Sequence, residues 1–376
     1  QRQMCIRDSI MKIEILRENL ERAVSGASRV SNKSLSLPVL GCVLLVVNRD
    51  RAVVRATNLD VSIETALKAK IFDEGVVAVP AHTLAQTVSA LTDQKLTLEV
   101  RGNTLVITGS RGKTSITTVD AVEFPKLPYV KEGEGVSVTL PTRDFSAALH
   151  AVSFAAATTS MKPELAAVAL TLEKGELIAA ATDSFRLAEV RIPVKTKGSF
   201  ETVLIPARNI PDILRAVDGG EEVEVRVGEN QCSFVTESGY LTSRTIDGAF
   251  PDYRAIIPKD SMASATCLKD DAIRAFRKVS IFADSYNQVH LSLKPSEKRF
   301  TIHTVNASVG EADDHLPATL EGEDIDINFN ARYITDVLSV MGGTSVAFSI
   351  AGPGRPMLIT DAPHKNFTYL VMPMNR

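Results

Sequence analysis

The chain has 376 residues, a formal net charge of -3, and 44 % apolar and 23 % charged residues. These values are typical of a soluble globular protein with two or three domains, and they argue against a simple polybasic nucleic-acid binder. No apolar run approaches the roughly 18 residues of a membrane-spanning helix. Cys5, Cys42, Cys232 and Cys267 are scattered, so neither a disulfide framework nor a zinc site is expected, and a reducing cytoplasm fits.

The first ten residues differ from the rest of the chain. They lack the charged-then-apolar layout of a signal peptide, and they lie outside the repeated pattern that begins at Met11. We expect residues 1–10 to be a disordered extension.

Apolar residues at helical spacing predict six helices, arranged as three pairs. The first helix of each pair is expected over residues 17–29, 142–155 and 269–283, and the second includes Leu84, Ile210 or Ile334. Thr142 follows Pro141 and precedes Asp144, which predicts that Thr142 is the N-cap of its helix.

Most other segments alternate apolar and polar residues, as strands do. Strands are expected at residues 42–47, 62–69, 96–100, 105–108, 167–172, 223–227, 288–293 and 300–305, with hairpin turns at 101–103, 173–175 and 228–230. Strands on both sides of paired helices predict antiparallel sheets covered by helices, which is an α+β fold.

One pattern occurs three times, about 125 residues apart, which is the size of a small domain. Its copies are VPAHTL at residues 79–84, IPARNI at 205–210 and FNARYI at 329–334. The repeat predicts three similar domains over residues 11–132, 133–261 and 262–376.

Basic side chains recur on the predicted helices. The candidates for contact with phosphates are Arg22, Arg29, Lys33, His82, Arg143, His150, Arg208, Arg215, Arg274, Arg277, Lys278 and Arg332. Any one of them could be an ordinary solvated charge, but His82, Arg208 and Arg332 occupy one position of the repeat. A shared basic surface would let an acidic protein face a polyanion.

Motifs of catalysis are missing. GSRGKT at residues 109–114 has two residues, not four, between its first glycine and the Gly-Lys pair, and a strand pattern follows, so a hairpin turn is expected rather than a P-loop. The six histidines show no metal-binding spacing, and Asp183 is expected to be a turn residue. We therefore expect no catalytic residue, no metal and no cofactor.

The segment at residues 368–374, TYLVMPM, is apolar throughout. Tyr369 to Val371 is predicted to be a final edge strand, ended by Pro373. Met372 and Met374 on either side of that proline suit an adaptable apolar patch that binds partners.

Four segments, in order on this repeat, resemble the β subunit of bacterial DNA polymerase III, the sliding-clamp family. They are LPVLG at residues 37–41, ATDSFRLA at 181–188, DGAFPDY at 247–253 and YLVMPM at 369–374. The resemblance covers essentially all of residues 11–376. It implies three clamp domains per chain and two chains in a closed homodimeric ring whose helices surround duplex DNA without reading its sequence.

The resemblance also implies partners. These are the catalytic subunit of DNA polymerase III, a clamp loader, and other polymerases and repair proteins that carry clamp-binding peptides. It implies a non-catalytic processivity factor in the bacterial cytoplasm, with no membrane contact.

In such clamps a short apolar peptide docks between the second and third domains. The matching positions are Thr182, Arg186, Leu187, Pro251, Ile256, Asn330, Tyr333, Pro356, Met357, Leu370, Val371, Met372, Pro373 and Met374. The sequence departs from common clamps at Ser184 and Phe185, often Gly-His, and at Ala255. The ring would close through Ile116 at one end and Ile281 and Phe282 at the other, although such residues could equally be core.

Two alternatives stay open at this stage. One is a specialised clamp paralogue, for example one that resists a clamp-directed inhibitor. The other is an α+β enzyme that uses Asp183 and nearby polar residues.

Overall fold

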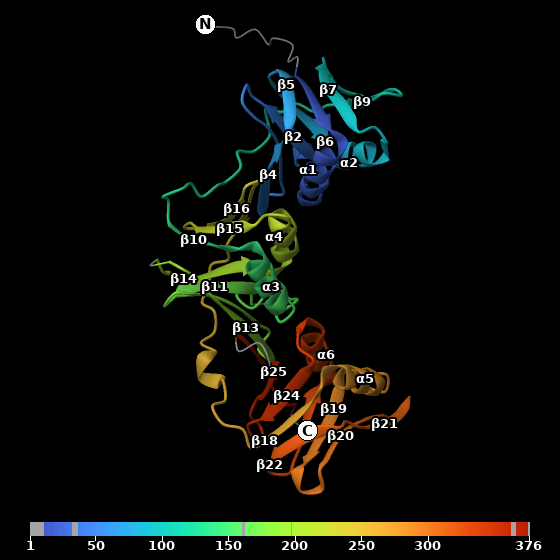
Figure 1. Cartoon of the computed structure of the whole chain (residues 1–376), viewed down its shortest axis with the longest axis vertical. Helices are drawn as coiled ribbons and strands as arrows, with labels where there is room; N and C mark the ends of the chain where they lie inside the picture. The colour runs from blue at the N-terminus through green and yellow to red at the C-terminus, as the bar shows by residue number, and fades with distance from the viewer. Residues whose placement is uncertain (1–10, 32–36, 160–161, 197, 362–365, 375–376) are drawn as a thin grey trace. The chain divides into compact units, whose positions relative to one another are not determined.

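The computed structural model describes residues 11–31, 37–159, 162–196, 198–361 and 366–374. The expected extension at residues 1–10 and the candidate Lys33 lie outside these ranges. The chain divides into two compact units, residues 1–143 with 209–245 and residues 144–208 with 246–376. Figure 1 labels most of the elements of both units.

The first unit contains two antiparallel sheets, in the orders β5-β1-β7-β8-β9 and β10-β15-β16-β17-β4-β3-β2-β6. Their strands are β1 (Lys12–Leu16), β2 (Cys42–Val47), β3 (Ala52–Thr57), β4 (Val61–Leu67), β5 (Ala69–Asp73), β6 (Gly75–Pro80), β7 (Lys95–Arg101), β8 (Thr104–Thr108), β9 (Lys113–Thr117), β10 (Val136–Pro141), β15 (Glu222–Val227), β16 (Gln231–Thr236) and β17 (Gly239–Arg244). Helices α1 (Arg17–Val30), α2 (Ala81–Ala90) and α4 (Ile210–Val217) belong to this unit. Helix α1 contacts both α2 and α4 and packs across β2, β3 and β4.

The second unit also contains two antiparallel sheets, in the orders β14-β11-β12-β13-β26-β25-β24-β18-β22 and β21-β20-β19-β23. Their strands are β11 (Ala167–Glu173), β12 (Glu176–Thr182), β13 (Arg186–Pro193), β14 (Phe200–Pro206), β18 (Ala263–Leu268), β19 (Gln288–Lys294), β20 (Arg299–Asn306), β21 (Gly310–His315), β22 (Ala318–Gly322), β23 (Ile325–Asn330), β24 (Ser345–Ile350), β25 (Met357–Asp361) and β26 (Phe367–Val371). Helices α5 (Lys269–Ser280) and α6 (Ala331–Val340) lie side by side, as Figure 1 shows, and α3 (Thr142–Ser153) leads into the unit.

The helices form because one face of each is apolar. In α1 the buried side chains are Leu20, Ala23, Val24, Ala27 and Val30, spaced three or four residues apart. The predicted helix starts at residues 17, 142 and 269 are confirmed, and the α+β class is confirmed with them. The short connections 101–104, 173–176 and 228–231 join neighbouring antiparallel strands, as expected.

The prediction that Thr142 caps α3 is wrong. Thr142 is the first helical residue, and its buried hydroxyl has no hydrogen-bond partner. The strand β10 ends at Pro141, so the chain passes from strand to helix without a loop residue to act as a cap. The Thr142 amide instead donates to the Glu221 carbonyl at 3.0 Å.

The strand β26 lies inside its sheet and not at the edge, so the edge-strand prediction is wrong as well. On one side it pairs with β13, from Arg186 opposite Val371 to Val190 opposite Phe367. On the other side it pairs with β25, where Met357 lies opposite Val371. Strand β17 pairs with β4 in the same manner in the first unit. Each large sheet therefore joins strands from two neighbouring copies of the repeat, and the boundaries 132/133 and 261/262 remain predictions.

The segment at residues 109–112 is a hairpin turn, as predicted. The Gly109 amide donates to the Gly112 carbonyl at 3.0 Å between β8 and β9. Asp93 accepts a hydrogen bond from the Ser110 amide at 2.6 Å and holds the turn in place. A strand follows the turn, so the geometry of a P-loop is excluded here.

Candidate functional site

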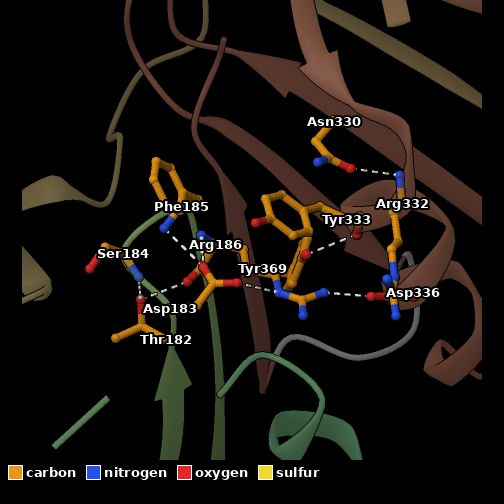
Figure 2. Close-up of polar contacts among 10 residues, drawn as sticks. All are labelled: Thr182, Asp183, Ser184, Phe185, Arg186, Asn330, Arg332, Tyr333, Asp336 and Tyr369. Carbon is orange, nitrogen blue, oxygen red and sulfur yellow. Dashed lines mark hydrogen bonds and ion pairs between the residues drawn. The ribbon is translucent and has the colours of Figure 1, made fainter. Parts of the chain in front are cut away.

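A tight turn between β12 and β13 begins the site. The Thr182 hydroxyl donates to the Arg186 carbonyl at 2.6 Å, and Asp183 Oδ1 accepts from the amides of Phe185 and Arg186 at 2.9 and 3.0 Å (Figure 2). Asp183 is thus a turn residue, as expected. Ser184 has φ 78, a left-handed conformation that glycine adopts more easily. The Phe185 side chain at the tip is 61 % exposed.

Arg186 connects this turn to helix α6. Its Nε donates to Asp183 Oδ2 at 3.0 Å, and its Nη1 donates to Asp336 Oδ2 (Figure 2). The guanidinium carbon lies 4.5 Å from the centre of the Tyr333 ring and 5.5 Å from that of Phe154. Burial lowers the pKa of Arg186, but its ion pairs with Asp336 and Asp183 outweigh burial and hold that pKa above its ordinary value. With its side chain only 10 % exposed, Arg186 serves to hold β13 and α6 together.

Helix α6 presents Tyr333 beside this arginine. The buried Tyr369 of β26 donates its hydroxyl hydrogen to the Tyr333 carbonyl at 2.8 Å (Figure 2). Burial raises the pKa of both tyrosines. Asn330 caps the helix by accepting from the Arg332 amide at 2.9 Å, and its Nδ2 donates to the Tyr286 carbonyl at 3.1 Å. Tyr286 is exposed, and it was not predicted from the sequence as a neighbour of the site. An aromatic residue in a polar loop was the signal that could have indicated it.

The tail after β26 runs from the turn between β12 and β13 to the strand β23. The Met372 amide donates to the Phe185 carbonyl, and the Met374 amide donates to the Asn328 carbonyl, both at 2.8 Å. Met372, Pro373 and Met374 are half-buried. The tail is therefore fixed by its backbone at both ends while its side chains keep some exposure.

The structure separates the predicted peptide-contacting residues into two groups by exposure. Six are buried and support the surface from within: Thr182, Leu187, Pro356, Met357, Leu370 and Val371. We call the seven that reach solvent the tail surface, namely Pro251, Ile256, Asn330, Tyr333, Met372, Pro373 and Met374. Ile256 is the most apolar of these, and it is 50 % exposed. Arg186, the remaining residue, is intermediate in exposure and belongs to neither group.

The basic candidates that the structure describes are all exposed, namely Arg22, Arg29, His82, Arg143, His150, Arg208, Arg215, Arg274, Arg277, Lys278 and Arg332. His82 and Arg332 are the second residues of α2 and α6, and Arg208 is the second residue of a 3-10 turn, η2 (Ala207–Asn209), that leads into α4. Two of the candidates also form ion pairs within their own helix, Arg215 with Asp212 and Arg274 with Asp271.

The three residues expected at a dimer contact differ in exposure. Ile116 on β9 is 5 % exposed and packs within its own unit, whereas Ile281, just after α5, is 70 % exposed. Phe282 is half-buried beside the turn that precedes β21. Both β9 and β21 are edge strands of their sheets.

In the part of the chain that the structure describes, no group of three or more His, Cys, Asp or Glu side chains is placed to hold a metal ion. No helix in these residues has both the length and the apolar composition to span a membrane.

Comparison with known sequences matches this chain in three parts. The sequence models of the DNA polymerase III beta subunit match with the N-terminal domain at residues 11–128, the central domain at 139–252 and the C-terminal domain at 254–375. A protein of Caulobacter vibrioides described as a beta sliding clamp is 30 % identical over 376 residues, covering 97 % of this chain and 100 % of that protein. The beta sliding clamp of Escherichia coli is 27 % identical, with the same coverage.

Solved structures show the same likeness. The DNA polymerase sliding clamp of Bacillus subtilis superposes with a TM-score of 0.91 at 25 % identity, covering 98 % of this chain and 100 % of that one. The sliding clamp of Pseudomonas aeruginosa bound to griselimycin gives a TM-score of 0.90 at 26 % identity, with the same coverage.

Proposed function

Because the chain belongs to the family of DNA polymerase III beta subunits, the sliding clamps, we propose that two copies close into a ring around duplex DNA. The observation that carries the DNA contact is the exposed basic side chain at one position of all three repeats, His82, Arg208 and Arg332. Such side chains contact phosphates without reading bases, which is what a protein that slides along DNA requires.

The ring would close head to tail through the edges of β9 and β21, with which no other strand of the described residues pairs. An edge strand offers free amide and carbonyl groups to a strand of another chain. The exposed Ile281 directly follows α5, and α5 packs against β21, so Ile281 would add apolar contact to that pairing. Ile281 and Phe282 are thus proposed to contact the partner in the dimer, and Ile116 is a buried residue that anchors β9 to its own unit.

The tail surface is the proposed docking site for partner peptides. It combines the apolar side chains of Ile256, Met372 and Met374 with the polar groups of Asn330 and Tyr333, a combination that suits short apolar peptides. Partners are the DNA polymerase III catalytic subunit, the clamp loader, and other polymerases and repair proteins. A polymerase tethered to a topologically linked ring rebinds DNA at a high effective concentration.

The chain itself would act as a non-catalytic processivity factor in the cytoplasm, with clamp domains at residues 11–132, 133–261 and 262–376. The test is loading by a clamp loader and ATP onto a nicked circular plasmid, followed by gel filtration. The protein should co-elute with the circle and be lost when a restriction enzyme linearises it. Retention on the linear DNA would contradict a sliding ring, and sedimentation at the mass of one chain would contradict the dimer.

A further inference from the structure

Two residues of the tail surface, Pro251 and Ile256, lie on a long connection, residues 246–257, which we call the strap. The Ile246 amide donates to the Leu204 carbonyl at 2.9 Å, and Phe250 packs on the core residues Ala167 and Ala169. The exposed Pro251 and Ile256 follow on the strap. These two residues belong to no helix or strand longer than one 3-10 turn, η3 (Arg254–Ile256), so their position depends on how the strap is held.

A cavity of about 210 Å³ separates the strap from the sheet. Its walls include Thr171 and Ile178 of the sheet and Phe250, Tyr253 and Arg254 of the strap. The strap does not pack tightly over this space, so polar contacts add to the packing of Phe250 in holding Tyr253 and Arg254 beside the sheet.

The buried contact is a hydrogen bond from the Tyr253 hydroxyl to Glu189 Oε2 of β13. Glu189 is 2 % exposed and also accepts from Arg191 Nε at 2.8 Å. A buried carboxylate is stable only with such partners, so the pairing is strongly favoured over an open strap. The second contact, Arg254 with Glu173, has side chains 45 % and 31 % exposed and therefore contributes little.

The same tyrosine is linked directly to Ile256 of the tail surface. The Tyr253 carbonyl accepts from the Ile256 amide at 3.1 Å, which starts the 3-10 turn that carries Ile256. On β13, Glu189 is two residues from Leu187, so both side chains lie on the same face of the sheet. The Tyr253–Glu189 bond thus holds the strap against the face of β13 that carries Leu187.

We propose that Glu189 and Tyr253 are positioning residues, which hold Pro251 and Ile256 where a partner peptide can contact them. This inference rests on the proposed peptide-docking role of the tail surface. Without the bond, the strap would sample positions away from β13, and only the closed fraction would bind peptide.

The experiment uses the full-length protein and a fluorescein-labelled clamp-binding peptide of the DNA polymerase III catalytic subunit. Tyr253→Phe removes one hydroxyl and keeps the ring, which contacts Phe250 edge-on at 5.8 Å. Thr171→Val is the matched control, because it removes a hydroxyl that faces the same cavity and bonds only Thr202 in the described contacts. Fluorescence anisotropy gives the dissociation constant, and hydrogen exchange gives the opening of amides 248–257.

Tyr253→Phe should weaken peptide binding about 10-fold and speed exchange of the strap amides, with the dimer unchanged and the melting temperature lowered by no more than about 4 °C. Glu189→Gln keeps an acceptor for the tyrosine and should lose less. The double variant should bind no more weakly than Tyr253→Phe alone, because both changes act on the same interaction. Thr171→Val should match the wild type in both measurements.

The outcomes distinguish this inference from the proposed function. A chain truncated after Val371 serves as the reference for loss of the docking site. If the truncation weakens binding but Tyr253→Phe leaves affinity and strap exchange unchanged, the positioning role is wrong and the docking site stands. If neither change affects binding, the docking site itself is wrong.

Discussion

Replacing Arg186 by methionine should destabilise the second unit more than the removal of any exposed ion pair would. Methionine keeps the length of the side chain but removes the bonds to Asp183 and Asp336 and the stacking on Tyr333. Removing one partner of a buried ion pair costs about 3–5 kcal/mol. Asp336 is 31 % exposed, so hydration of its unpaired carboxylate offsets part of that cost. We expect a decrease of about 2–4 kcal/mol in the free energy of unfolding, including about 1 kcal/mol from the ring contact.

The assay is urea unfolding followed by tyrosine fluorescence, since the chain has six tyrosines and no tryptophan. Arg299→Met is the control, because Arg299 pairs with Glu297 at the surface of the same unit and both side chains are 52 % exposed. That variant should change stability by less than about 0.5 kcal/mol. Arg186→Lys keeps the charge but loses the planar fork that reaches both carboxylates, so it should fall between the two.

A double-mutant cycle with Asp336→Asn isolates the link between β13 and α6. The coupling energy should be about 1–3 kcal/mol. If Arg186→Met matched Arg299→Met, or if the cycle gave no coupling, the view of Arg186 as the connection between turn and helix would be refuted.

Three further outcomes are expected. Truncation after Val371 should weaken peptide binding at least about 10-fold, measured by anisotropy, with the dimer intact by sedimentation, because Met372–Met374 supply much of the apolar tail surface. Changing Arg208, Arg215, Arg274 and Arg277 to Ala should shorten retention on nicked circles and lower the dependence of retention on salt concentration, because fewer phosphates are contacted. Burial raises the pKa of Tyr369 above its ordinary value of 10.0. Stability should therefore decrease above pH 10, with Tyr369 contributing about 1.4 kcal/mol per pH unit because the unfolded chain alone releases that proton, and Tyr369→Phe should reduce the slope in urea unfolding.

Each of these has a contrary result. Unchanged peptide affinity after truncation would place the docking site elsewhere. An unaltered salt dependence would show that those four arginines do not meet phosphates. If the free energy of unfolding fell with pH above pH 10 equally steeply for the wild type and Tyr369→Phe, then Tyr369 would not be a group that titrates on unfolding.

The elements with a strong local pattern were predictable. The helix starts at residues 17, 142 and 269 and the strand 42–47 agree with the structure because periodic burial is encoded within about a dozen neighbouring residues. The hairpin at residues 109–112 followed from a count of residues between two glycines.

Pairings between distant segments were not predictable. Nothing near Thr368 or Val371 in the sequence indicates that β26 lies between β13 and β25, because strand register depends on partners far along the chain. The bond between Arg186 and Asp336 and the one between Tyr253 and Glu189 were missed for the same reason. Thr142 has the residue type of a cap, but the absence of a loop before α3 overrides that preference.

The interior position of β26 also affects how the protein is made. A ribosome completes β13 about 180 residues before β26, which at about 5–20 residues per second leaves the edge of β13 without its partner for about 10–35 s. During that time an open strand edge can pair with another nascent chain. The tail surface also does not exist until β26 is in place, so a growing chain cannot capture a polymerase before its largest sheet is whole.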